Sequence, residues 1–89
     1  MALAWVTGAH GFIGRYLARS LEADGYRVAG IGHGAWPEAE AAQWGLSFWL
    51  NSEISASHLG QMRRSRGLPD VVFHLAGAAA AGAALAHAH

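Results

Sequence analysis

The sequence contains no cysteine and no lysine among its 89 residues, and proline occurs only twice. Without cysteine, the chain has no disulfide, no thiolate zinc site and no cysteine nucleophile. It suits a reducing compartment, and we expect a cytoplasmic protein. Without lysine, it has no P-loop lysine, no Schiff-base lysine and no Tyr-x-x-x-Lys couple. If the protein is an enzyme, part of its active site lies outside these residues.

Charged residues are also scarce, at 13% of the chain, and six arginines balance six acids to a formal net charge of zero. This balance provides no electrostatic attraction for nucleic acid or for an anionic membrane. The N-terminus lacks the basic region of a signal peptide. The one candidate for a membrane span, residues 71–88, is mostly alanine and glycine. We therefore expect neither nucleic-acid nor membrane partners.

Hydrophobic residues make up 53% of the chain, which predicts one small domain with a packed core. Short apolar runs typical of buried strands alternate with amphipathic segments typical of helices. The predicted strands are residues 3–6, 27–31, 46–50 and 71–75, and the predicted helices are residues 12–24, 38–44 and 55–66. On the first helix, we expect Ile13, Leu17 and Leu21 to face the core.

This alternation predicts a parallel sheet that is covered by helices, because crossover connections between parallel strands are right-handed. We expect a partial, three-layer α/β fold of the Rossmann-like kind, with four strands in the order 3-2-1-4. Residues 1–77 form this unit. Residues 78–89 are an alanine- and glycine-rich tail, at which we expect a longer chain to be cut.

Three glycines, each separated by two residues, join the first predicted strand to the first helix. Gly8 permits a tight turn, Gly11 removes a side chain where a diphosphate would approach the backbone, and Gly14 permits close packing of helix and sheet. The positive end of the helix then faces the diphosphate. The turn therefore predicts a dinucleotide site, and the alternative is a purely structural turn.

Residues 6–14, VTGAHGFIG, resemble the cofactor motif of the extended short-chain dehydrogenase/reductases, the NAD-dependent epimerase/dehydratase family. Residues 70–77, DVVFHLAG, are similar to the fourth strand of that family, and the resemblance spans most of residues 3–80. It implies the N-terminal cofactor-binding part of an enzyme that acts mostly on nucleotide sugars. It also implies further strands, a substrate domain and a catalytic Tyr-x-x-x-Lys beyond residue 89.

The sequence departs from the family at the end of the second strand. Many members have an aspartate there that accepts hydrogen bonds from the adenosine ribose, whereas this chain has Gly32 followed by His33. Glycine tolerates a 2′-phosphate, which Arg15 or a protonated His33 could pair with. NAD and NADP both stay open as cofactors. Near the end of the third strand, Ser52 or Glu53 is the nearest match to the family's adenine contact.

The turn and the resemblance together define a set of candidate cofactor-binding residues. These are Gly8, His10, Gly11, Phe12, Ile13, Arg15, Gly32, His33, Leu75, Ala76 and Gly77. We expect no catalytic residue in this chain. We also expect no metal site, because the six histidines lack ligand spacing. His74 is expected to be packed and held by hydrogen bonds, and the four tryptophans to serve core packing and loop attachment.

The expected function is that of the NAD(P)-binding part of a nucleotide-sugar epimerase, dehydratase or reductase, working by hydride transfer with a bound nicotinamide. The substrate would be bound mainly by residues beyond 89. The alternative is a non-catalytic NAD(P)-binding sensor or regulatory module. A Tyr-x-x-x-Lys beyond residue 89 would favour the enzyme. A homodimer is a candidate assembly, and the open edge of the fourth strand would favour self-association if residues 1–89 were the whole polypeptide.

Overall fold

The computed structural model of the protein describes residues 2–75, in which four strands alternate with three helices. The elements in chain order are β1 (Leu3–Thr7), α1 (Phe12–Ala23), β2 (Arg27–Gly32), α2 (Glu38–Gln43), β3 (Phe48–Asn51), α3 (Ala56–Arg66) and β4 (Val71–His74). Among these described residues, no helix is long and apolar enough to cross a membrane.

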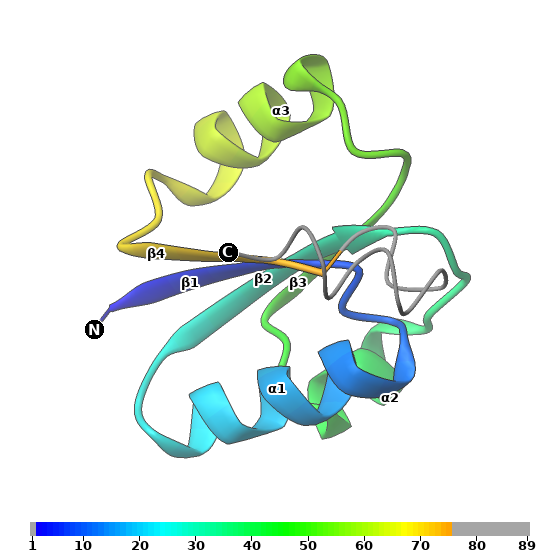
Figure 1. Cartoon of the computed structure of the whole chain (residues 1–89), viewed down its shortest axis with the longest axis vertical. Coiled ribbons are helices and arrows are strands. Elements are labelled where there is room, and N and C mark those ends of the chain that lie inside the picture. The colour runs from blue at the N-terminus through cyan, green and yellow to red at the C-terminus, as the bar shows by residue number, and fades with distance from the viewer. Residues whose placement is uncertain (1, 76–89) are drawn as a thin grey trace.

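The strands form one parallel sheet in the order β3-β2-β1-β4, which confirms the predicted topology (Figure 1). Thr7 at the end of β1 pairs with Ile31 of β2 on one side and with His74 of β4 on the other. Gly32, the last residue of β2, pairs with Asn51, the last residue of β3. The carboxyl ends of all four strands therefore meet at one edge of the sheet, and the turns that follow them lie near one another.

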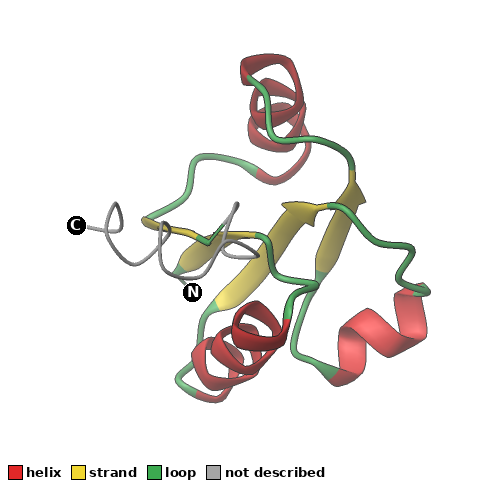
Figure 2. Cartoon of the chain, turned by 45° about the vertical axis from the view of Figure 1, so that its right-hand side comes forward, coloured by secondary structure: helices red, strands yellow, loops and turns green. Residues whose placement is uncertain are grey.

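The helices cover both faces of the sheet, with α1 and α2 on one face and α3 on the other (Figures 1 and 2). The α1 and α2 face has a core that includes Val6, Val28 and Leu46. The α3 face has a core that includes Trp5 and Met62, both more than nine-tenths buried. Because β1 and β2 contribute side chains to both cores, these two central strands read as continuous apolar runs in the sequence.

Helix α1 contacts the sheet through a different line of residues from the one expected. Gly14, Ala18 and Leu21 are its buried positions, while Ile13 is 61% exposed, so the prediction that Ile13 faces the core is wrong. Small residues lie closest to the sheet because the helix approaches it tightly at Gly14. The larger Leu17 packs at the flank of the core, half-buried.

The third strand begins two residues later than predicted. The Leu46 amide donates to the Ala41 carbonyl and closes the end of α2, so Leu46 is not part of the strand although it is buried in the core. Ser47 uses both its amide and its hydroxyl to bond the Val28 carbonyl (2.9 and 3.0 Å). Periodicity alone does not distinguish such a buried connection from a strand.

Candidate functional site

The glycine-rich turn after β1 is attached to the carboxyl end of β2. Gly8 has φ +75°, a conformation that side-chain-bearing residues rarely adopt, and the chain turns sharply there. The Gly8 amide donates to the Ile31 carbonyl (2.7 Å), and the Gly11 amide donates back to the Gly8 carbonyl (3.0 Å). The turn is therefore a closed, hydrogen-bonded loop at the centre of the sheet edge.

The third glycine of the turn lies where helix and turn touch. A Cβ atom on Gly14 would contact the Gly8 carbonyl oxygen and would lie 2.7 Å from the Ala9 Cα, closer than real Cβ atoms come to backbone. Only glycine fits this position without moving the helix away from the sheet. The close packing predicted for Gly14 is confirmed.

The N-terminus of α1 is open to a ligand. Gly11 occupies the N-cap position, which therefore provides no side-chain hydrogen bond, and the first turn of the helix contains no acidic residue. Phe12 and Ile13 are 77% and 61% exposed. The first amides of a helix have no intrahelical partner, and together with the helix dipole they attract an anion. This end of α1 is thus suited to the phosphates of a ligand.

The loop from β2 to α2 lies beside the turn and is held by side chains from β3. The Gly34 amide donates to Asn51 Oδ1 (3.1 Å), and Trp49 Nε1 donates to the Gly34 carbonyl (3.0 Å). At the end of β2, Gly32 is buried, and a Cβ there would lie 3.2 Å from Trp49 Cη2 and 3.3 Å from the Gly8 Cα. His33, the next residue, is exposed.

Three rings, those of His10, Trp36 and Trp49, which we call the aromatic cluster, join this loop and β3 to the glycine turn. The His10 ring meets the Trp36 ring edge-on (centroids 5.0 Å apart, 86°) and lies 5.9 Å from the Trp49 ring. It occupies the space that a side chain on Gly34 would need. His10 therefore packs between the turn and the loop as a spacer.

Arg15, from the first turns of α1, lies close to Trp36 of the aromatic cluster and to Trp44. Its guanidinium carbon lies 5.3 Å from the Trp36 ring centroid and 5.2 Å from that of Trp44, and Nη2 donates to the His10 carbonyl (2.8 Å). The half-buried Arg15 has no ion-pair partner among residues 2–75, and its buried Nε has no hydrogen-bond partner there. Its hydrogen bond joins α1 to the turn, and no carboxylate of residues 2–75 forms an ion pair with its charge.

The end of β4 is tied to β1 next to the turn. Thr7 Oγ1 lies 2.8 Å from His74 Nδ1 and accepts the Leu75 amide at 3.0 Å. The predicted hydrogen bonding of His74 is confirmed, but its predicted packing is wrong, because its side chain is exposed in the described chain. Leu75 lies at this edge, whereas Ala76 and Gly77 fall outside the described residues.

The structure therefore brings together most of the residues that the sequence singled out. Gly8, His10, Gly11 and the buried Gly32 lie together at the carboxyl ends of β1 and β2, with Arg15 bonded to His10 and with Phe12 and Ile13 exposed at the start of α1. Sequence reasoning missed three residues that shape this surface. They are Thr7, Trp49 and Asn51. The polar residue at the end of the third predicted strand was the one available signal, for Asn51.

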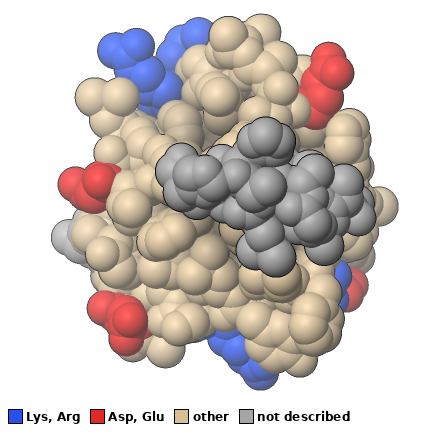
Figure 3. Space-filling view, in the orientation of Figure 1, with Lys and Arg blue, Asp and Glu red and all other residues tan. Residues whose placement is uncertain are grey.

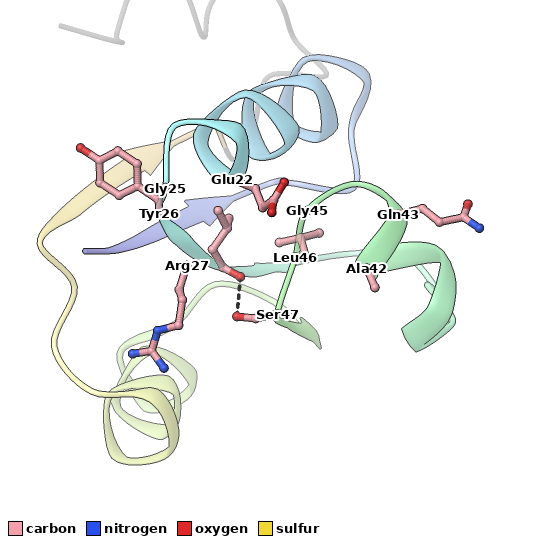
Figure 4. A pocket seen from close by; sticks show the side chains of 10 residues that line it. Glu22, Gly25, Tyr26, Arg27, Ala42, Gln43, Gly45, Leu46 and Ser47 are labelled. Atoms are coloured by element: carbon pink, nitrogen blue, oxygen red, sulfur yellow. Dashed lines mark hydrogen bonds between the residues drawn. The ribbon is translucent and has the colours of Figure 1, made fainter. Parts of the chain in front are cut away.

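One hollow of the described residues lies away from the glycine turn. A hollow of about 340 Å³ is lined by residues that include Glu22, Arg27 and Gln43 (Figure 4). It lies at the amino end of β2, whereas ligands of open α/β sheets bind at the carboxyl ends. Within residues 2–75, no three His, Asp or Glu side chains group as metal ligands do. On the face drawn in Figure 3, charged side chains are scattered around the rim, with no single-sign patch among the described residues.

A parallel sheet in this order, with a glycine-rich turn after its first strand, defines the Rossmann-like class of α/β folds. The family model of the NAD dependent epimerase/dehydratase family matches residues 4–89, and the chain belongs to that family. No curated protein matches the chain significantly. Among solved structures, the crystal structure of AibC is similar in fold, with a TM-score of 0.60 and 23% identity over 80% of this chain. The chain spans 22% of the length of that structure.

Proposed function

We propose that this chain binds a nicotinamide dinucleotide at the glycine turn and is the cofactor-binding part of an oxidoreductase. The observation that carries the proposal is the N-terminus of α1, which no side chain caps. The turn before it is closed by the hydrogen bond from the Gly11 amide to the Gly8 carbonyl, and Gly11 has no side chain to block a ligand. Family membership supports the same reading. When bound, a nicotinamide cofactor accepts or donates a hydride.

In this proposal, each part of the surface binds a different part of the cofactor. The amides of Phe12 and Ile13 donate to the diphosphate, since both residues are exposed in the first turn of an uncapped helix. Gly32 and His33 lie against the adenosine ribose at the end of β2. Leu75, with Ala76 and Gly77 after it, lies against the nicotinamide half.

The chemistry on the substrate requires groups that this chain lacks. No lysine is present, so a Tyr-x-x-x-Lys couple must come from other residues of the protein. We propose that such residues also bind a nucleotide sugar and complete a cytoplasmic epimerase, dehydratase or reductase. On this proposal, residues 1–77 are the dinucleotide-binding half of the fold and residues 78–89 lead into the remainder. A homodimer is the assembly that we propose to test first.

A cofactor-binding sensor without chemistry is the second candidate function. It is favoured by one observation, which is that these 89 residues contain no lysine and therefore no Tyr-x-x-x-Lys couple of their own. Substrate turnover separates the two candidates. An enzyme converts a nucleotide sugar into a product by hydride transfer to or from the cofactor, whereas a sensor binds the cofactor and leaves the sugar unchanged.

The test of the proposed function is an equilibrium titration of the full-length protein with NADH and NADPH, followed by tryptophan quenching and by the fluorescence of the cofactor. The variant Gly11→Val places a branched side chain against the Gly8 carbonyl, which is 3.3 Å from an ideal Cβ, and over the diphosphate position. We expect saturable binding by the wild type and none by this variant.

The matched control for this titration is Gly60→Val on α3, far from the turn and with only the flexible tip of Arg64 near an ideal Cβ. It should bind the cofactor as the wild type does. A folded wild-type protein that binds neither cofactor would refute the proposed function.

A further inference from the structure

The end of β2 has no acidic side chain, and the space around Gly32 is tight for any side chain. An aspartate or glutamate there would accept hydrogen bonds from the ribose 2′-hydroxyl and repel a 2′-phosphate. At Gly32, an ideal Cβ would lie 3.2 Å from the Trp49 ring and 3.3 Å from the Gly8 backbone. The Gly8 backbone is itself fixed by its hydrogen bond to Ile31. The packing of the turn against β2 and β3 therefore favours glycine, which has no carboxylate, at this position.

The loop that follows also presents no carboxylate to the ribose. His33 is exposed, Gly34 is held by Trp49 and Asn51, and the first acid after β2 is Glu38, on α2. The side chains of β3 that bond this loop, Trp49 and Asn51, are both neutral. The imidazole of His33 has an N–H donor that suits a phosphate oxygen.

Next to this loop, Arg15 carries a positive charge that has no ion-pair partner among residues 2–75. Arg15 is half-buried between Trp36 and Trp44, and no carboxylate of the described chain pairs with it. A partly buried charge without a counter-charge is costly, and an anion bound nearby offsets that cost. Arg15 is connected to the loop through His10, whose carbonyl it bonds and whose ring packs against Gly34. Arg15 thus contacts the part of the glycine turn that packs against this loop.

We infer that the cofactor is the dinucleotide with a 2′-phosphate, NADP(H), selected by the acid-free loop at Gly32 and His33 over the unpaired charge of Arg15. This inference rests on the proposed function and deepens it. His33 is the direct contact, and Arg15 is a positioning residue that also contributes charge. A dinucleotide with a 2′-hydroxyl finds no carboxylate on residues 32–37, which are the end of β2 and the loop after it.

The test uses the full-length protein, with dissociation constants for NADPH and NADH measured by fluorescence. Competition by 2′,5′-ADP and by 5′-ADP, which lack the nicotinamide, isolates the contribution of the 2′-phosphate. We expect NADPH to bind at least about tenfold more tightly than NADH, since one charge-assisted contact is worth about that factor. We expect 2′,5′-ADP to bind more tightly than 5′-ADP by a similar factor.

Two variants assign the preference to the named residues. His33→Gln replaces an exposed side chain and should leave folding intact, while Arg15→Gln removes the charge beneath the loop. Both variants should reduce the preference for NADPH, measured as the ratio of the NADH and NADPH dissociation constants. Arg15→Lys should retain part of this preference. Arg19→Gln is the matched control, because Arg19 also stacks on Trp44 (4.7 Å) but lies one helical turn further from the loop. It should leave the ratio unchanged.

The outcomes separate this inference from the function on which it rests. Equal binding of both cofactors, or tighter binding of NADH, would overturn the inference and leave the dinucleotide site standing. A NADPH preference that survives both His33→Gln and Arg15→Gln would overturn the assignment to these residues. Failure of the folded protein to bind either cofactor would overturn the proposed function and the inference together.

Discussion

Thr7 and His74 are linked across the carboxyl ends of β1 and β4, with Thr7 Oγ1 2.8 Å from His74 Nδ1. The same hydroxyl accepts the Leu75 amide at 3.0 Å, and that amide also bonds the Thr7 carbonyl. Thr7 is 2% exposed and immediately precedes the glycine turn. One side chain therefore fixes both the start of the turn and the exit of β4, the two segments that flank the proposed cofactor.

The substitution Thr7→Val tests this link because valine keeps the shape of threonine and lacks the hydroxyl. We expect the free energy of unfolding to fall by about 1 kcal/mol, as the Leu75 amide keeps its bond to the Thr7 carbonyl. Urea unfolding of the protein measures this difference. Thr7→Ser retains the hydroxyl and should lose less stability, so equal stability of the valine variant and the wild type would argue against the link.

The close approach of α1 to the turn predicts opposite effects for two glycine-to-alanine substitutions in helices. Gly14→Ala places a methyl group against the backbone of Gly8 and Ala9, and overpacking of this kind costs about 1–3 kcal/mol. Gly60→Ala on α3 meets only the tip of Arg64, so the gain in helix propensity should stabilise the protein by about 0.5–1 kcal/mol. Thermal unfolding of the two variants compares them directly. If Gly14→Ala left stability unchanged or raised it, the tight contact at Gly14 would be wrong.

A carboxylate at the other end of the sheet joins β4 to β1. Asp70 Oδ2 accepts the Leu3 amide at 2.7 Å, and the Asp70 amide donates to the Leu3 carbonyl at 2.8 Å. Because Asp70 is exposed, we expect Asp70→Ala to cost only about 1 kcal/mol of stability. Asp24→Ala is the control, since that exposed carboxylate makes no hydrogen bond to a described residue. Chemical denaturation of both variants should show a loss for Asp70→Ala alone.

Because the Asn51 side chain bonds the loop after β2, a negative charge at this position should change the preference between NADPH and NADH. Asn51→Asp keeps an oxygen that can accept the Gly34 amide, and it adds a negative charge beside the loop. We expect this variant to lose NADPH affinity by about tenfold or less while NADH affinity changes little, because only NADPH carries the 2′-phosphate. Fluorescence titration at low salt measures both. Equal losses for the two cofactors would instead mean that the substitution disturbs the loop itself.

Much of the fold could be predicted because its signals are local. The strand order follows from alternating elements and right-handed crossovers, and the turn follows from the spacing of Gly8, Gly11 and Gly14. The exposure of Ile13 could not be predicted. The periodicity of α1 indicates which residues share an apolar face of the helix. Which of them are buried depends on how closely Gly14 lets the helix approach the sheet.

The surroundings of the proposed site were harder to predict than its glycines. His10, Trp36 and Trp49 come from three separate segments, and their ring contacts follow from how the loops fold back, which has no period in the sequence. Arg15 appeared from the sequence as a partner for a phosphate, yet the structure places it beneath the loop and against aromatic rings. Contacts between loops depend on tertiary packing, so only the structure reveals them.

The most direct test of the account is a crystal structure of the full-length protein with NADPH bound. We expect the diphosphate oxygens to lie about 3 Å from the amides of Phe12 and Ile13, with the 2′-phosphate beside His33. A cofactor bound elsewhere, with the first turn of α1 free of phosphate, would contradict the central claim that the glycine turn is a dinucleotide site.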